Sequence, residues 1–323
     1  MANICITSIC NRGCSYCFAQ GNINKPDYMS LNLFQRSLSF IKRSNIDKVR
    51  LLGGEPTLHP QFGEILRLSR ETGKSILLFT NGLIHEKELN LLLQIPTDKI
   101  NVLINITQLP TEENEVFTRQ RRTIEHLGKR ISLGINIFRP EIHQDFIFDI
   151  FQGIEINKSL RVGLALPRLG SENVWLHPRQ YPFVGMRIAR LAEMAAKQGV
   201  HLSFDCGFVP CMFSKETLSL LRSTKADLGW RCNPILDIDT AGNIIHCFPL
   251  EGLFSVSLDE EIDAKTLRTQ FIKKTRLFSK VGIYTDCSEC DLKHIGECPG
   301  GCLAVRAKRF QNYQDLELKN NDS

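Results

Sequence analysis

The sequence predicts an α/β fold: a partial (βα)6 TIM-like barrel with a small cysteine-rich C-terminal domain. Six short apolar, β-branched runs alternate with segments of helical spacing between residues 3 and 166. Eight of the twelve cysteines lie beyond residue 205. A chain of 323 residues is longer than a typical domain, so one large domain with a smaller one appended is expected.

The six runs are the predicted strands. They are Asn3–Thr7, Lys48–Leu52, Ser75–Thr80, Ile100–Ile106, Ile131–Ile137 and Leu160–Leu166. Strands that alternate with helices form parallel βα units, and six such units make a barrel that is open at one side. Because chemistry in such barrels lies at the carboxyl ends of the strands, functional residues are expected directly after each run.

The predicted helices lie between and after these runs. The first carries Leu31, Phe34, Leu38 and Ile41 at three- and four-residue intervals, with Ser30 as its N-cap. The second carries Phe62, Ile65 and Leu66, and later ones cover Glu86–Leu93, Glu112–Leu127, Ile142–Ile154 and Met186–Gln198. The predicted domains are 1–200 for the barrel and 201–310 for the cysteine-rich region, and 311–323 is predicted to be a disordered tail.

Composition excludes several classes of protein. The chain is 42% hydrophobic and 23% charged, as in ordinary globular proteins, and its net charge of +5 is dispersed along the sequence. The basic residues form no stripe, so nucleic-acid binding is not predicted. No apolar run reaches the roughly 20 residues that span a bilayer, and Met1–Ile9 lacks the basic start of a signal peptide. The protein is expected to be cytoplasmic, with neither membrane nor nucleic acid as a partner.

Cys10, Cys14 and Cys17 form a CxxxCxxC loop directly after the first strand. Clustered thiols in a reducing cytosol bind metal more often than they form disulfides. Three thiolates can hold three irons of a 4Fe–4S cluster and leave the fourth iron open to an organic ligand. A zinc loop is the alternative, and it would need a fourth Cys or His. Cys5 is a poor fourth ligand, because alternation along the strand points it into the barrel wall.

The second and third strands end in further motifs. These are Gly53, Gly54, Glu55 and Pro56 after the second strand, and Thr80, Asn81 and Gly82 after the third. The two glycines let backbone approach a ligand without a Cβ collision, and Glu55 offers an acceptor to an ammonium group. CxxxCxxC, GGEP and TNG, in this order on successive strands, resemble the radical S-adenosylmethionine (SAM) superfamily.

The resemblance implies a cofactor site at these positions. It implies that Cys10, Cys14 and Cys17 bind the 4Fe–4S cluster and that the amino and carboxylate groups of SAM occupy the open iron. The implied SAM-binding residues are Tyr16, Gly53, Gly54, Glu55, Pro56, Thr80 and Asn81, with Tyr16 at the adenine and Gly53, Gly54 and Glu55 at the amino group. Asn105 or Thr107, and Asn136, are the matching ribose or carboxylate contacts. Polar strand ends capped by solvent or backbone are the alternative for these three.

The resemblance also implies the reaction. A reduced cluster passes an electron into the sulfonium, and the resulting 5′-deoxyadenosyl radical takes hydrogen from the substrate. The cluster potential is then expected towards the negative end of the roughly −700 to +450 mV open to iron–sulfur centres. The barrel must shut out water and oxygen, so an oxygen-sensitive oxidoreductase is expected. An electron donor such as flavodoxin or ferredoxin is implied as a partner.

The C-terminal cysteines resemble the SPASM extension, which binds auxiliary iron–sulfur clusters. They are Cys206, Cys211, Cys232, Cys247, Cys287, Cys290, Cys298 and Cys302. A hairpin is predicted around Gly242, four residues before Cys247. A zinc ribbon is the alternative, because zinc sites use the same CxxC units.

The ligand sets stay open at this point. In the family one cluster would take Cys232, Cys247, Cys302 and either Cys206 or Cys211. The other would take Cys287, Cys290 and Cys298 and needs a fourth ligand, because no cysteine follows Cys302. That ligand could be the remaining cysteine, an Asp or a His, or the iron could stay open. One or two auxiliary 4Fe–4S clusters are therefore expected.

The resemblance guides the prediction of substrate. Phe248 stands where sulfatase-maturing members carry an Asp base, which disfavours sulfatase maturation and leaves the catalytic acid or base unassigned. Many SPASM proteins modify a peptide or protein side chain, which is the predicted substrate. The barrel is expected to start at residue 3 without a leader-binding domain before it, which weakens the peptide interpretation unless a separate protein delivers the substrate. One alternative is radical oxidation or epimerisation of a small sugar-like metabolite. Another is a non-catalytic cysteine-rich metal-binding protein, which has no need of GGEP and TNG.

Overall fold

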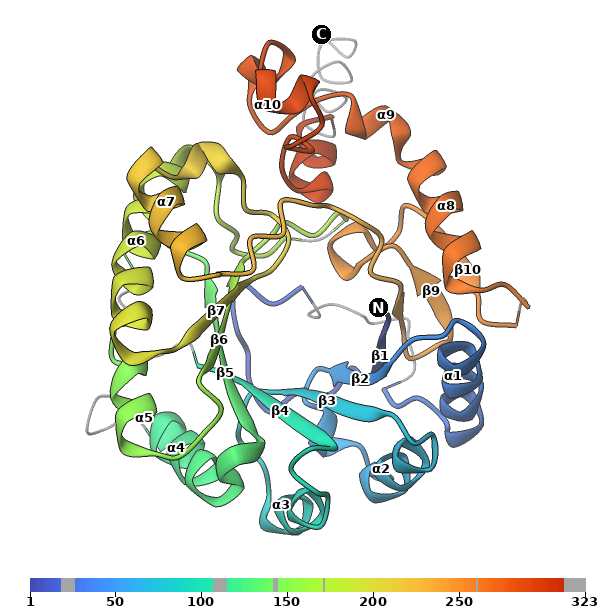
Figure 1. The fold of residues 1–323 in the computed structure, drawn as a ribbon. Helices are drawn as coiled ribbons and strands as arrows, with labels where there is room; N and C mark the ends of the chain where they lie inside the picture. The colour runs from blue at the N-terminus through green and yellow to red at the C-terminus, as the bar shows by residue number, and fades with distance from the viewer. Residues whose placement is uncertain (19–26, 107–114, 142–144, 171, 260, 311–323) are drawn as a thin grey trace, which may run out of the picture.

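Parallel strands in chain order form the wall of a barrel in the computed structural model (Figure 1). The structure describes residues 1–18, 27–106, 115–141, 145–170, 172–259 and 261–310. The parallel strands are β1 Asn3–Thr7, β2 Lys48–Gly53, β3 Ser75–Thr80, β4 Ile100–Asn105, β5 Ile131–Ile137, β6 Ser159–Leu164 and β7 His201–Phe204. The predicted α/β barrel is confirmed, and β7 extends the sheet one strand beyond the predicted six.

Helices cover the outside of this wall (Figure 1). They are α1 Leu31–Arg43, α2 Phe62–Glu71, α3 Glu86–Leu93, α4 Glu115–Leu127, α5 Ile147–Gly153 and α6 Tyr181–Gln198. Ser30 caps α1 as predicted, since its Oγ accepts a hydrogen bond from the Leu33 N–H at 3.2 Å. The predicted starts of the fourth and fifth helices, together with the predicted tail, fall on residues outside the described ranges.

The wall is buried on both faces around β1. All five of its residues are buried, and Ile4 and Ile6 are fully so. A strand covered on both sides can carry apolar residues at consecutive positions, as β1 does at Ile4, Cys5 and Ile6. Phe34 and Ile41 of α1 belong to the same core cluster.

The C-terminal strands join the barrel sheet rather than standing apart. They are β8 Asp237–Ile238, β9 Asn243–Ile245 and β10 Ser255–Ser257. Strand β8 pairs with β1 in parallel and with β9 antiparallel, which confirms the predicted hairpin and gives the order β10-β9-β8-β1 through to β7. One sheet therefore contains strands from both sides of the predicted domain boundary at residue 200, and the division into two domains stays a prediction.

The remaining helices follow the C-terminal strands and β7. They are α7 Lys215–Ser223, α8 Ala264–Lys274, α9 Arg276–Ser279 and α10 Asp291–His294. In Figure 1 the segment from α8 to α10 runs along the side of the ring between β10 and α7. Strands β7 and β10 are the two edges of the sheet as far as the described residues show.

Candidate functional site

The loop after β1 is tied to the loop after β2 by backbone hydrogen bonds. The N–H of Gly54 donates to the Thr7 carbonyl at 2.8 Å, and the N–H of Glu55 donates to the Ile9 carbonyl at 2.7 Å. Within the cysteine loop, the N–H of Cys17 donates to the carbonyl of Cys14 at 3.0 Å. The GGEP segment thus fixes where the CxxxCxxC loop begins.

Gly53 and Gly54 allow this close contact between the two loops. A Cβ on Gly53 would lie 2.4 Å from the Thr7 carbonyl oxygen, and one on Gly54 would lie 2.3 Å from that of Ile9. Both distances are far inside van der Waals contact. The expected approach of these glycines to a ligand stays a prediction. The atoms that leave no room for a Cβ belong to the end of β1 and to Ile9, just before the cysteine loop.

Replacing Gly54 with alanine is expected to displace the cysteine loop. Overpacking of this kind costs about 1–3 kcal/mol, and here the atoms that must move are backbone. Thermal unfolding and iron content of the reconstituted protein measure the effect, and both should fall. Gly153→Ala is the matched control, because nothing lies within 4 Å of its added Cβ. Equal stability and iron content in the two variants would contradict this role of Gly54.

Glu55 joins GGEP to the third motif from a fully buried position. Its carboxylate accepts hydrogen bonds from the N–H and Oγ1 of Thr57 at 3.2 and 2.7 Å, from Thr80 Oγ1 at 2.9 Å and from the Asn81 N–H at 2.8 Å. Burial raises the pKa of Glu55, and these hydrogen bonds oppose the rise. The side chain has no exposed surface, and its hydrogen bonds join the loops after β2 and β3. Its contact with the SAM amino group stays a prediction.

Asn81 completes the junction of the three motifs. Its Nδ2 donates to Asn11 Oδ1 at 2.8 Å and lies 3.7 Å from the Sγ of Cys10. Asn11 Nδ2 in turn donates to the Leu83 carbonyl at 3.2 Å. CxxxCxxC, GGEP and TNG, which are far apart in sequence, therefore form one hydrogen-bonded unit at the carboxyl ends of β1, β2 and β3.

Tyr16 lies in the same loop and faces the later strands. Its ring stacks on that of Phe138, with 4.7 Å between the centroids, and its carbonyl accepts from Asn173 Nδ2 at 3.2 Å. Pro56 is buried and begins a short 3-10 helix that ends at Leu58. The placement of Tyr16 at the adenine and the role of Pro56 in SAM binding stay predictions, and the contacts of both residues within the protein were not foreseen.

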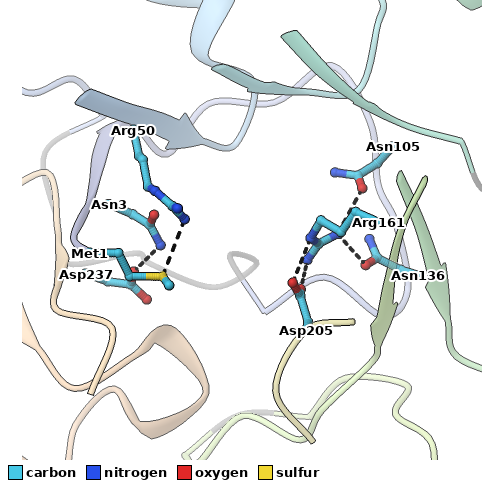
Figure 2. Close-up of polar contacts among 8 residues, drawn as sticks. All are labelled: Met1, Asn3, Arg50, Asn105, Asn136, Arg161, Asp205 and Asp237. Atoms are coloured by element: carbon cyan, nitrogen blue, oxygen red, sulfur yellow. Dashed lines mark hydrogen bonds and ion pairs between the residues drawn. The ribbon is translucent and has the colours of Figure 1, made fainter. Parts of the chain in front are cut away.

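Asn105 and Asn136 lie inside the barrel with a charged pair that sequence reasoning missed. Each accepts a hydrogen bond through Oδ1 from NH1 of Arg161 at 3.3 Å (Figure 2). Arg161 Nε also donates to Asp205 Oδ1 at 3.0 Å, which makes an ion pair. The missed signals were an arginine inside the predicted sixth strand and an aspartate directly after β7. Thr107 falls outside the described residues.

Four of the eight C-terminal cysteines gather beside β8. Cys302 and Cys232 share a side-chain hydrogen bond, which raises the pKa of Cys302 and lowers that of Cys232. The N–H of Leu303 also donates to Cys232 Sγ at 3.4 Å. Burial, followed by the neighbouring Cys232, raises the pKa values of Cys206 and Cys247. Cys206 is therefore close to this group.

The other four cysteines gather near the start of α6. Burial raises the pKa of Cys211 to about 11, with Cys298, Cys287 and Cys290 as the next causes. Cys211 lies in the short 3-10 helix Pro210–Met212, which contacts α6. Tyr284, three residues before Cys287, donates from its hydroxyl to the Pro178 carbonyl at 2.7 Å, just before α6. The two segments thus meet at the same helix.

Thiols in two groups suit sulfur-ligated metal centres. In the described part of the chain, no three His, Cys, Asp or Glu side chains are arranged to hold a single metal ion. An iron–sulfur cluster differs in that each thiolate binds its own iron, so its ligands lie farther apart than those of one ion. The donor set, four thiols in each group, fits such a cluster.

Comparison with known proteins identifies the N-terminal part. The family model of the radical SAM superfamily matches residues 4–110, which include all three motifs. The chain carries a radical SAM domain. The predicted recognition is confirmed, and the cofactors of this family are a 4Fe–4S cluster and SAM.

Curated proteins of two kinds are similar to this chain. GTP 3′,8-cyclase from Actinobacillus pleuropneumoniae serotype 3 is 28% identical over 205 residues, which cover 61% of this chain and 56% of that protein. The cyclase from Chlorobaculum tepidum is covered to 38%, so the chain spans about half the length of these relatives. Mycofactocin maturase MftC from Mycobacterium ulcerans is 23% identical over 315 residues, covering 93% of this chain and 82% of that protein.

Solved structures support the fold over nearly the whole chain. SuiB from Streptococcus suis, bound to S-adenosylmethionine, has a TM-score of 0.69 at 15% identity and covers 94% of this chain and 72% of its own. The anSMEcpe structure with bound AdoMet has a TM-score of 0.66 at 16% identity, with 100% and 99% covered. At these identities the likeness concerns the fold alone. In the parts of the chain that the structure describes, no helix is long and apolar enough to cross a membrane.

Proposed function

We propose that this protein is a radical SAM enzyme with a SPASM-like extension that modifies a peptide or protein side chain. The observation that carries the proposal is the junction of CxxxCxxC, GGEP and TNG through Glu55 and Asn81. A metal-binding protein without catalysis needs the cysteines but has no use for a buried carboxylate that locks two other motifs onto them. This argues against the non-catalytic alternative.

Cys10, Cys14 and Cys17 would hold the cluster, with SAM at its open iron. The cluster and SAM, when bound, would supply a 5′-deoxyadenosyl radical that takes hydrogen from the substrate. The protein's own part is to hold the cysteine loop by the backbone bonds of Gly54 and Glu55. The SAM contacts are proposed at Tyr16, Gly53, Gly54, Glu55, Pro56, Thr80, Asn81, Asn105 and Asn136.

The two cysteine groups support two auxiliary 4Fe–4S clusters with complete ligand sets. The first set is Cys206, Cys232, Cys247 and Cys302, and the second is Cys211, Cys287, Cys290 and Cys298. Cys211 would then be the fourth ligand of the second cluster, which no cysteine after Cys302 can supply. A zinc ribbon would use the same residue types, and sulfide in the isolated protein would distinguish the two.

A peptide or protein substrate is supported by the relatives that match along most of the chain. MftC is a maturase by name, and its match covers 93% of this chain. SuiB, which has the same fold, has been solved with its precursor peptide SuiA. Phe248 is buried and stacks on Phe18 with 5.5 Å between the ring centroids, so an apolar group occupies the position of the sulfatase-maturing Asp. This disfavours sulfatase maturation.

A small-molecule substrate is the second candidate. Several relatives are named GTP 3′,8-cyclase, after a nucleotide substrate, and the match to one of them covers 61% of this chain. Labelled substrates separate the candidates: deuterium from a peptide side chain should appear in 5′-deoxyadenosine, whereas deuterium from GTP or a sugar should not. Transfer from GTP or a sugar alone would contradict the peptide proposal. An external electron donor such as flavodoxin or ferredoxin is part of the proposal and is replaced by dithionite in this assay.

A further inference from the structure

Asn105 and Asn136 each lie against a glycine of the next strand. The sheet register pairs Asn105 with Gly134 and Asn136 with Gly163. A Cβ on Gly134 would lie 2.6 Å from Asn105 Oδ1, and one on Gly163 would lie 2.7 Å from Asn136 Oδ1. The absence of these two Cβ atoms leaves room for both amide side chains to lie across the neighbouring strand inside the barrel.

Arg161 determines which end of each amide is available to a ligand. Its NH1 donates to Oδ1 of Asn105 and of Asn136, both at 3.3 Å. A guanidinium only donates hydrogen bonds, so the atom that faces it must be the amide oxygen in both cases. Figure 2 shows the oxygen of each amide on the dashed line to Arg161 and the nitrogen off that line. Both NH2 groups are thereby left for other partners.

Asp205 holds Arg161 in this orientation. The carboxylate accepts a hydrogen bond from Nε at 3.0 Å and another from NH2 of the same guanidinium, so the two side chains form a bidentate ion pair, a fork. The side chains of Arg161 and Asp205 are 21% and 39% exposed, so the pair is partly accessible to solvent. A fork restrains the rotation of the guanidinium more than a single contact would.

We propose that Arg161 is a positioning residue for SAM. Held by Asp205, it orients Asn105 and Asn136 so that their NH2 groups donate to acceptor oxygens of SAM, in its carboxylate or its ribose. Without Arg161 either amide could turn over and present its carbonyl oxygen to those acceptors, which would exchange an attraction for a repulsion. The inference rests on the proposed function, because it assumes that SAM binds at these strands.

The first test is SAM affinity in Arg161→Met, measured by equilibrium dialysis of labelled SAM against the anaerobically reconstituted protein. The dissociation constant should rise roughly ten- to a hundredfold, because two oriented hydrogen bonds are lost. Arg161→Lys, which keeps a donor but not the fork, should recover part of the affinity. Arg130→Met is the matched control: Arg130 is also half-buried, and among the described residues it donates to the carbonyls of Leu93 and Ile95. Iron content should be the same in all three variants.

A double-mutant cycle separates positioning from general support of the fold. Asn105→Ala should weaken SAM binding in the wild type but much less in Arg161→Met, because the amide is already unrestrained there. Additive effects, or wild-type affinity in Arg161→Met, would overturn the inference while leaving the proposed function intact. A wild-type protein that carries its iron but binds no SAM would overturn the proposed function, and the inference with it.

Discussion

A variant with Cys10, Cys14 and Cys17 all replaced by alanine is expected to lose one cluster and to keep the others. The three thiols are the only protein ligands proposed for that cluster, so their loss removes about four iron atoms with their sulfide. The two C-terminal cysteine groups, which do not include these three residues, should keep about eight. Iron and sulfide analysis measures the loss. Paramagnetic resonance of the reduced protein should no longer respond to added SAM.

Cys5→Ala is the control for this triple variant. Cys5 precedes the same loop but is 5% exposed and packs against Ile245 and Phe248 in the wall. Its iron content and its response to SAM should equal those of the wild type. An unchanged iron content in the triple variant would show that the loop holds no cluster, and zinc without sulfide in its C-terminal region would favour the zinc-ribbon alternative.

The second large effect is expected from the division of the C-terminal cysteines into two groups. Cys206→Ala and Cys211→Ala should each cost one auxiliary cluster, but different ones. Adding Cys211→Ala to the pair Cys287→Ala and Cys290→Ala should therefore remove no further iron, because all three substitutions act on one site. Adding Cys206→Ala to the same pair should remove about four iron atoms more. If the two combinations lost equal amounts, the division would be wrong.

The same variants test what the extension does. Loss of Cys287 and Cys290 should abolish product formation with the preferred substrate and spare some SAM cleavage without substrate, since the proposed SAM contacts all lie on or directly after β1 to β5. 5′-Deoxyadenosine and product are quantified side by side. Because losing a cluster can unfold the small region around it, circular dichroism of each variant comes first. Product formation at the wild-type level would make the extension structural only.

The barrel was predictable because its strands are local and apolar. The runs at Asn3–Thr7 and Ser75–Thr80 match β1 and β3 residue for residue. Strand β7 was missed because its four residues include a histidine and a serine and so form no apolar run. The placement of β8 was beyond sequence reasoning for another reason: Asn3 pairs with Asp237 across 234 residues, and no local pattern specifies such a partner.

The candidate site was predictable in its motifs but not in its contacts. The spacing of Cys10, Cys14 and Cys17 is a local property, so it could be read directly. That Glu55 would be fully buried depends on the side chains of Thr57 and Thr80, which converge only in the folded chain. The partner of Cys211 likewise depends on where α6 brings two distant loops together, which spacing cannot specify.

Formation of 5′-deoxyadenosine tests the central claim most directly. The wild-type protein, reconstituted with iron and sulfide without oxygen and reduced by dithionite, should convert SAM to 5′-deoxyadenosine and methionine in equal amounts. The variant that lacks Cys10, Cys14 and Cys17 should form neither above background. A wild-type protein that carries its full iron and sulfide yet leaves SAM intact, or a triple variant that cleaves SAM at the wild-type rate, would contradict the account.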